Sequence, residues 1–109
     1  MNLTELSFDT ATLAEGYAKK AFTISDIVRE SLRRIHEGDS KIWISVDTET
    51  NLIKQAEALE NVDSKSLPLY GIPFAVKDNI DVGNLPTTAA CPDYKYFPEN
   101  DASVIAQLR

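Results

Sequence analysis

Residues 71–83 read Gly71-Ile72-Pro73-Phe74-Ala75-Val76-Lys77-Asp78-Asn79-Ile80-Asp81-Val82-Gly83. The triplet Phe74-Ala75-Val76 is apolar on both faces, which predicts a strand buried on both sides, as in an α/β sheet. Lys77 follows at the carboxyl end of this strand, where α/β folds place their ligands. The segment therefore predicts an α/β fold and makes Lys77 the first candidate for a functional residue.

Lys77 has two interpretations at this stage. A lysine in a buried setting gives up its proton readily and can act as a base. Alternatively, the strand emerges into solvent at this point and Lys77 is an ordinary hydrated lysine, since buried lysines are rare. The residues around it leave both interpretations open.

The prolines divide the rest of the chain. All 5 of them lie between residues 68 and 98, which predicts a mostly helical part over residues 1–66 and a strand with the lysine motif over residues 67–83. Residues 84–100 have no periodicity and are expected to form a long loop. Asp101 is expected to cap a helix over residues 101–109, which has a start signal and no stop signal. We therefore expect residues 1–109 to be the front part of a longer domain.

Three helices are expected before the motif. Apolar spacing predicts the first over residues 10–21, with Leu13, Tyr17 and Ala21 on one face. The sequence Thr23-Ile24-Ser25-Asp26 resembles a capping box and opens the second, which Gly38 ends. A third is expected to begin at an Asp47 cap and to bury Leu52, Ala56 and Leu59. Residues 41–46 between the last two are expected to be extended.

Composition excludes several classes of function. The net charge of the 109 residues is −6 and no basic stripe is present, so we expect no nucleic-acid partner. The 4 glycines are too scattered for a glycine-rich nucleotide loop. No apolar run is long enough to span a membrane. The single cysteine and the absence of an export signal predict a cytoplasmic protein without a disulfide.

Other side chains that could carry chemistry have structural explanations as well. Asp78 and Asp81 could hold a cation, but carboxylates at a strand end more often accept backbone N–H bonds. Cys91 would need a base to be a nucleophile, and the only histidine is His36, which suits the end of a helix. The aromatic cluster Tyr94-Lys95-Tyr96-Phe97 could stack bases, but packing of the loop against the sheet is the simpler interpretation.

The segment from Pro68 onward resembles the amidase signature family around its catalytic lysine. The resemblance rests on Gly71-Ile72-Pro73, Val76-Lys77-Asp78-Asn79 and Leu85-Pro86-Thr87-Thr88, with softer support from Ile42-Trp43-Ile44 and Gln55-Ala56. Within the family, the continuation Ala89-Ala90-Cys91-Pro92 is most similar to the allophanate hydrolases. It replaces the Cys-Gly-Ser or Ala-Gly-Ser that is expected in the A subunit of the glutamyl-tRNA amidotransferase.

The resemblance implies a mixed-sheet amidase fold, of which residues 1–109 are the N-terminal fragment. It implies a Ser-cisSer-Lys triad in which Lys77 is the general base, no metal and no cofactor. Both serines lie beyond Arg109 in the family, so the fragment alone is expected to be inactive. The implied reaction cleaves the C–N bond of allophanate, a small amide, to ammonia and carbon dioxide. Three alternative functions stay open: another amidase of the family, the A subunit of the glutamyl-tRNA amidotransferase, or a non-catalytic partner-binding domain. A homo-oligomer also stays possible.

Overall fold

The structure is a computed structural model that describes residues 2–109, and it divides into two compact units. The first contains the chain up to residue 40 and residues 48–73; the second contains residues 41–47 and 74–109. The helical elements, in chain order, are η1 (Leu3–Glu5), α1 (Thr10–Ala18), α2 (Ile24–Glu37), α3 (Glu49–Leu59), η2 (Ser64–Ser66), η3 (Pro92–Tyr94) and α4 (Ser103–Leu108), where η is a 3-10 helix.

Helix α1 begins where predicted and ends earlier. The Asp9 carboxylate accepts the Thr12 N–H at 2.8 Å and caps the helix. The predicted end at Ala21 is wrong, because α1 stops at Ala18 and Lys20 adopts a left-handed conformation with φ of 56°. This turn brings Phe22 into the interior, where it is only 7% exposed.

The predicted capping box of α2 is confirmed. The Thr23 hydroxyl accepts the Asp26 N–H at 3.1 Å, and the Asp26 carboxylate accepts the Thr23 N–H at 2.9 Å. The helix ends before Gly38, as expected, although this glycine has a φ of −82° and needs no left-handed conformation.

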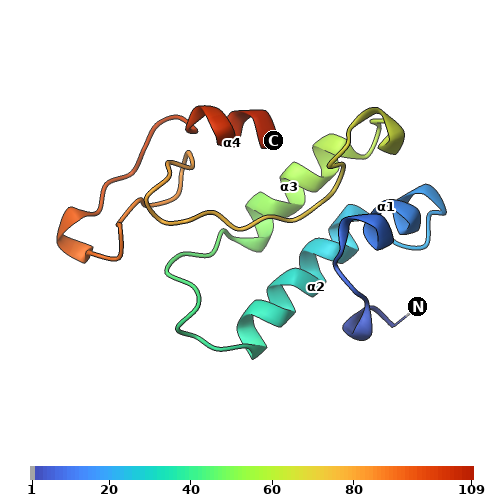
Figure 1. Ribbon diagram of the computed structural model, residues 1–109, viewed down its shortest axis with the longest axis horizontal. Coiled ribbons are helices and arrows are strands. Elements are labelled where there is room, and N and C mark those ends of the chain that lie inside the picture. Colours follow the sequence, from blue (N-terminus) through green and yellow to red (C-terminus); the bar gives the residue numbers. More distant parts are fainter. Residues whose placement is uncertain (1) are drawn as a thin grey trace. The chain divides into compact units, whose positions relative to one another are not determined.

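Helix α3 is capped by Thr48 rather than by Asp47. The Thr48 hydroxyl accepts the Asn51 N–H at 3.1 Å, so the helix begins one residue later than the Asp47 prediction placed it. Helices α2 and α3 pack against each other and run antiparallel (Figure 1). Of the predicted row, Ala56 is buried, whereas Leu52 and Leu59 are only half-buried, Leu59 against the same core.

The core of the first unit forms around Tyr17. It consists of Leu13, Tyr17, Phe22, Ile24, Ile27 and Ala56. The Tyr17 ring makes edge-to-face contacts with Phe22 and Tyr70, at centroid distances of 5.2 and 5.5 Å. Tyr70 lies just before the Gly-Ile-Pro segment, so this core holds the start of the motif.

Arg34 fixes the N-terminal residues on the same unit. Its guanidinium donates to the carbonyl oxygens of Leu3 at 3.0 Å and Leu6 at 2.7 Å, and it lies 3.9 Å from the centre of the Phe8 ring.

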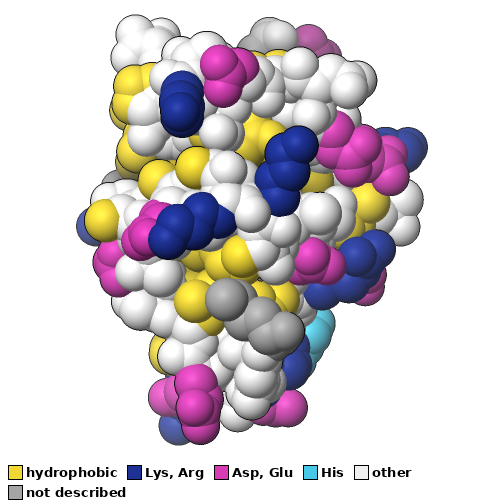
Figure 2. All heavy atoms as spheres, turned by 90° about the vertical axis from the view of Figure 1, so that its right-hand side faces the viewer, with side chains coloured by type: hydrophobic (Ala, Val, Ile, Leu, Met, Phe, Trp, Pro, Cys, Tyr) yellow, Lys and Arg dark blue, Asp and Glu magenta, His cyan; other side chains and the backbone are white. Residues whose placement is uncertain are grey.

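The charged side chains of both signs are mixed on the face that Figure 2 shows. That face therefore carries no field of a single sign.

The predicted strand before Lys77 is not formed in the part of the chain that the structure describes. Residues 72–77 are irregular in backbone and pair with no other segment, and Phe74 is 47% exposed. The only bridge among residues 2–109 is an isolated antiparallel one between Thr87 and Tyr96. A strand needs a neighbour for its backbone N–H and C=O groups, and residues 2–109 provide none here. The described part is therefore mostly helical rather than α/β.

The N-cap of the last helix, α4, lies one residue later than predicted. Ala102, not Asp101, is the N-cap of α4. The Asp101 carboxylate instead accepts the Gly83 N–H at 2.7 Å and pairs with Arg109 at 3.1 Å. The loop over residues 84–100 is thereby closed at its base by a contact between its two ends.

Candidate functional site

Lys77 lies in the second unit, immediately before a turn, and its side chain is exposed. Its carbonyl oxygen accepts the Ile80 N–H at 3.0 Å, which closes the turn. Over residues 2–109 its ammonium group makes no hydrogen bond or ion pair. The structure thus matches the interpretation of a hydrated lysine and leaves the ammonium accessible to groups from outside these residues.

Gly71 is the first residue of the motif and belongs to the first unit. It has a φ of +65°, and a Cβ atom at this position would lie 2.7 Å from the Tyr17 ring. The Tyr17 hydroxyl donates to the Gly71 carbonyl oxygen at 2.6 Å. Burial raises the pKa of the Tyr17 phenol far above its ordinary value, so the phenol stays protonated and keeps donating. Both the backbone conformation and the packing therefore require glycine here.

Asp78, the residue after the lysine, is joined to the loop by three hydrogen bonds. Its carboxylate accepts the Thr88 N–H at 3.3 Å and makes a very short contact with the Thr88 hydroxyl. Its carbonyl oxygen accepts the Ala89 N–H at 2.9 Å. Thr88 is 6% exposed and Asp78 is half-buried, so this junction is partly shielded from water.

Asp81 makes a second junction in the same unit. Its carboxylate accepts the Thr87 hydroxyl at 2.9 Å and the Tyr96 phenol at 2.5 Å, and its carbonyl oxygen accepts the Ala102 N–H at 2.9 Å. The hydrogen bond to the Asp81 carboxylate raises the pKa of Tyr96. The expected backbone N–H donor is found at the Asp78 carboxylate, whereas the Asp81 carboxylate accepts two side-chain hydroxyls instead.

Two alanines in the loop have unusual backbone conformations. Ala89 and Ala90 both lie in the left-handed region, with φ of 50° and 60°. Such a conformation is costly for a residue with a Cβ atom, and two in succession mark a turn that its surroundings enforce. Sequence reasoning missed this turn and the burial of Thr87 and Thr88. The one available signal was Ala90, which stands where the A subunit of the glutamyl-tRNA amidotransferase is expected to have glycine.

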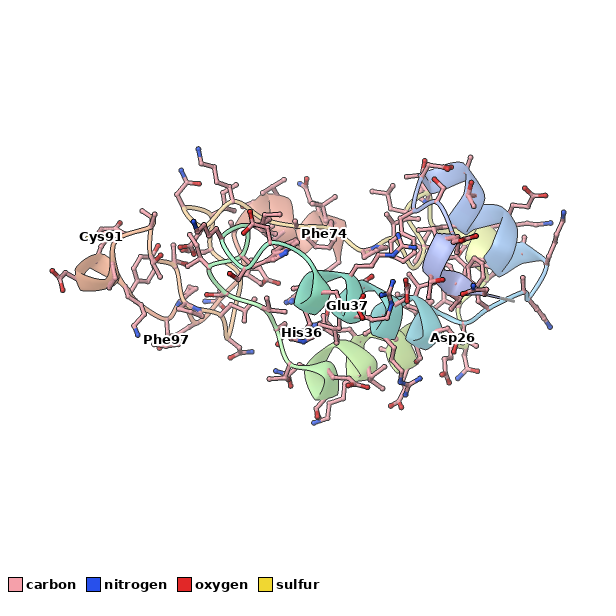
Figure 3. All side chains as sticks on the ribbon, turned by 90° about the horizontal axis from the view of Figure 1, so that it is seen from below. Asp26, His36, Glu37, Phe74, Cys91 and Phe97 are labelled. Atoms are coloured by element: carbon pink, nitrogen blue, oxygen red, sulfur yellow. The ribbon has the colours of Figure 1, made fainter. Side chains whose placement is uncertain are left out.

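Of the remaining candidates, Tyr96 belongs to the Asp81 junction, and the Cys91 N–H donates to the Thr88 carbonyl oxygen at 2.8 Å. Cys91 is exposed beside the η3 turn, and His36 is exposed near the end of α2, in the other unit (Figure 3). The expected packing of the aromatic cluster is wrong, because Tyr94 is 58% and Phe97 65% exposed. Tyr94 instead contacts Tyr96 edge to face, at a centroid distance of 5.8 Å.

Within residues 2–109, no three His, Cys, Asp or Glu side chains are arranged to hold a metal ion. No helix of the described residues is long and apolar enough to cross a membrane.

The family model described as Amidase matches residues 26–109, which include most of α2, all of α3, the lysine motif and both aspartate junctions. The chain belongs to the Amidase family. The resemblance to amidases is therefore confirmed, and the Gly71 turn and the Asp78 and Asp81 junctions are features of an amidase segment.

Two kinds of curated amidase relative match the chain. It is 53% identical over 68 residues to the urea amidolyase of Saccharomyces cerevisiae, a match that covers 62% of this chain and 4% of that protein. It is 42% identical over 90 residues to the A subunit of the glutamyl-tRNA(Gln) amidotransferase of Lactobacillus johnsonii, covering 80% of this chain and 18% of that one. The chain thus spans only a small part of these relatives.

Solved structures agree with this assignment. The urea amidolyase of Kluyveromyces lactis superposes with a TM-score of 0.76 and 32% identity, over 94% of this chain and 6% of that one. The allophanate hydrolase of the same yeast gives a TM-score of 0.75 and 32% identity, over 94% of this chain and 17% of that one. The fold of the described residues is that of a segment of these enzymes.

Proposed function

We propose that this chain carries the general-base lysine, Lys77, of an amidase that cleaves the C–N bond of allophanate to ammonia and carbon dioxide. The observation that carries the proposal is the unbroken run from Gly71 to Asn79 in a chain with 53% identity to a urea amidolyase over 68 residues. The structural likeness to an allophanate hydrolase, with a TM-score of 0.75, supports the same substrate.

The proposed chemistry is acyl transfer through a Ser-cisSer-Lys triad. The neutral lysine takes a proton from the bridging serine, which takes one from the nucleophilic serine as that oxygen attacks the amide carbonyl. The C–N bond then breaks, and the nitrogen takes the relayed proton and leaves as ammonia. Water hydrolyses the acyl-enzyme that remains. Both serines and the groups that stabilise the oxyanion come from outside residues 1–109 in this proposal, so residues 1–109 alone are expected to be inactive. The exposed, unpaired ammonium of Lys77 in the described residues supports a lysine whose partners are supplied from elsewhere.

The proposed substrate is a small molecule, and no nucleic acid, membrane or metal takes part. The single cysteine, which is exposed, suits the reducing cytoplasm, where we place the reaction. The second candidate is the A subunit of a glutamyl-tRNA amidotransferase, favoured by the 42% identity over 80% of this chain. It predicts ammonia release from glutamine instead of allophanate.

The test uses the polypeptide that contains this sequence, purified from its source cells, with ammonia release from allophanate and from glutamine as the two assays. Lys77→Ala is expected to lower kcat by about 10²–10⁴-fold, because it removes a general base. Lys77→Arg is expected to be as inactive, since a guanidinium cannot be deprotonated. Lys54→Ala, at an exposed position of α3, is the matched control.

Each outcome selects one function. Ammonia from allophanate that Lys77→Ala abolishes and Lys54→Ala spares supports the proposal. Ammonia from glutamine alone selects the amidotransferase. A native product of only 109 residues with neither activity would overturn both and leave a partner-binding domain.

A further inference from the structure

The hydrogen bonds between Asp78 and Thr88 connect the residue next to the lysine with a buried point of the loop. Thr88 is 6% exposed, whereas Lys77 is exposed. The carboxylate takes the N–H and the hydroxyl of the same threonine, which is a two-point attachment. The Asp78 carbonyl oxygen adds a third point at Ala89, at 2.9 Å. Asp78 therefore has little freedom to rotate about its backbone.

The loop side of this junction is itself rigid. The Thr88 hydroxyl accepts the Ala90 N–H at 3.1 Å, and the Thr88 carbonyl oxygen accepts the Cys91 N–H at 2.8 Å. These two bonds close the turn in which Ala89 and Ala90 are left-handed. The Thr88 hydroxyl thus donates to Asp78 and accepts from Ala90, and one oxygen atom links the lysine motif to the enforced turn.

On the lysine side, the backbone is held and the side chain is not. The Lys77 carbonyl oxygen accepts the Ile80 N–H at 3.0 Å. The next residue in the chain, Asp78, is held by its bonds to Thr88 and Ala89. No group in residues 2–109 holds the ammonium. The direction in which the lysine side chain leaves the backbone is consequently set by the backbone at residues 77 and 78.

We propose that Asp78 and Thr88 are positioning residues that aim Lys77 by holding the backbone directly after it. This inference rests on the proposed function, because it concerns the same lysine as the base. A base must lie within hydrogen-bond reach of the proton that it takes, and a displacement of about 1 Å can cost about 10²-fold in rate. Neither residue touches the substrate in this proposal.

Thr87 supplies a closely matched control. It precedes Thr88, is 2% exposed, and donates its hydroxyl to Asp81 at 2.9 Å. Valine in place of either threonine keeps the shape of the side chain and removes one hydroxyl. Thr87→Val therefore loosens the same loop at a carboxylate that is not adjacent to the lysine. A purely structural role predicts equal effects of Thr87→Val and Thr88→Val on activity per folded molecule.

The experiment measures two quantities in the full polypeptide. The first is kcat and KM for ammonia release, where Thr88→Val is expected to lower kcat by about 10–100-fold with little change in KM. Thr88→Ser, which keeps the hydroxyl, is expected to restore kcat, and Thr87→Val to leave it nearly unchanged. The second is the rate of reductive methylation of Lys77 relative to Lys54, read by peptide mass spectrometry. Thr88→Val is expected to change this ratio, and Thr88→Ser to return it to the wild-type value.

The labelling readout separates the two proposals. If the wild type releases no ammonia but Thr88→Val still changes Lys77 labelling, the proposed function fails and the positioning role stands. If labelling of Lys77 is the same in the wild type and Thr88→Val, the positioning role is overturned, whatever the activity. It is also overturned if Thr87→Val lowers kcat as strongly as Thr88→Val.

Discussion

The hydroxyl of Tyr17 donates a 2.6 Å hydrogen bond to the carbonyl oxygen of Gly71. These residues lie far apart in the sequence, on α1 and at the start of the lysine motif. The Tyr17 ring fills the space that a side chain at residue 71 would need, and a Cβ atom there would also lie 2.9 Å from the Ile24 side chain. The motif glycine is thus explained by packing in the first unit as well as by its own backbone.

Gly71→Ala is expected to destabilise the protein by about 2–4 kcal/mol. The left-handed backbone accounts for about 1–2 kcal/mol of this, and the overlap of the new methyl group with the Tyr17 ring for the rest. Urea unfolding followed by tyrosine fluorescence measures the change. Tyr17→Phe keeps the ring and removes only the hydrogen bond, so it should cost about 1 kcal/mol. A Gly71→Ala protein as stable as the wild type would contradict this account of the turn.

Ala90→Gly is expected to stabilise the protein by about 0.5–1 kcal/mol. Glycine adopts the φ of 60° found at Ala90 without the steric cost of a Cβ atom, and this gain exceeds the entropy that glycine loses on folding. The same substitution at Ala14, on the exposed side of α1, is the control and should destabilise by about 1 kcal/mol. Thermal denaturation of the two variants should give shifts of opposite sign; shifts of the same sign would contradict the left-handed turn.

The helices were predictable because each depends on local sequence. The Thr23 capping box of α2 is confirmed, since a cap acts within a few residues. The errors at Asp47 and Asp101 are of one residue, and in both cases a neighbour takes the cap. Nothing local distinguishes two adjacent cap positions, so such boundaries depend on the packing around them.

The motif segment was less predictable because its partners are distant. The apolar triplet at residues 74–76 predicted a strand, but pairing depends on a neighbouring segment that residues 2–109 do not provide. The junctions of Asp78 with Thr88 and of Asp81 with Thr87 and Tyr96 cross the loop. Sequence spacing identifies such residues as hydrogen-bond formers but does not say which of them meet.

Thr23→Ala is expected to lower the free energy of unfolding by about 1 kcal/mol. It removes the side-chain half of the α2 capping box, which leaves the Asp26 N–H without its acceptor. The control is Thr50→Ala, at an exposed position inside α3, where alanine is the better helix former and no loss is expected. Equal destabilisation by the two changes in urea unfolding would argue against the cap.

The stability of the protein is expected to fall as the pH drops from about 4.5 towards about 2, in part through Glu30. Glu30 is 6% exposed, and hydrogen bonds from Arg33 at 2.7 and 2.8 Å and from Arg34 at 2.9 Å lower the pKa of its carboxyl group to about 2. A lowered pKa means that the unfolded chain binds the proton first. The contribution of Glu30 is therefore complete above the unfolded pKa and is lost as the pH falls through the folded one.

Asp9 titrates over the same range, since the Ser7 hydroxyl and the Thr12 N–H lower its pKa to about 2 as well. Urea midpoints are therefore compared between the wild type and Glu30→Gln from pH 7 to pH 2. Glu30→Gln should be less stable than the wild type at pH 7, and the difference should shrink as the pH falls. Glu57→Gln, on the exposed side of α3, should show a pH profile parallel to that of the wild type. A stability difference for Glu30→Gln that stays constant from pH 7 to pH 2 would mean that the two arginines do not lower the pKa of the Glu30 carboxyl group.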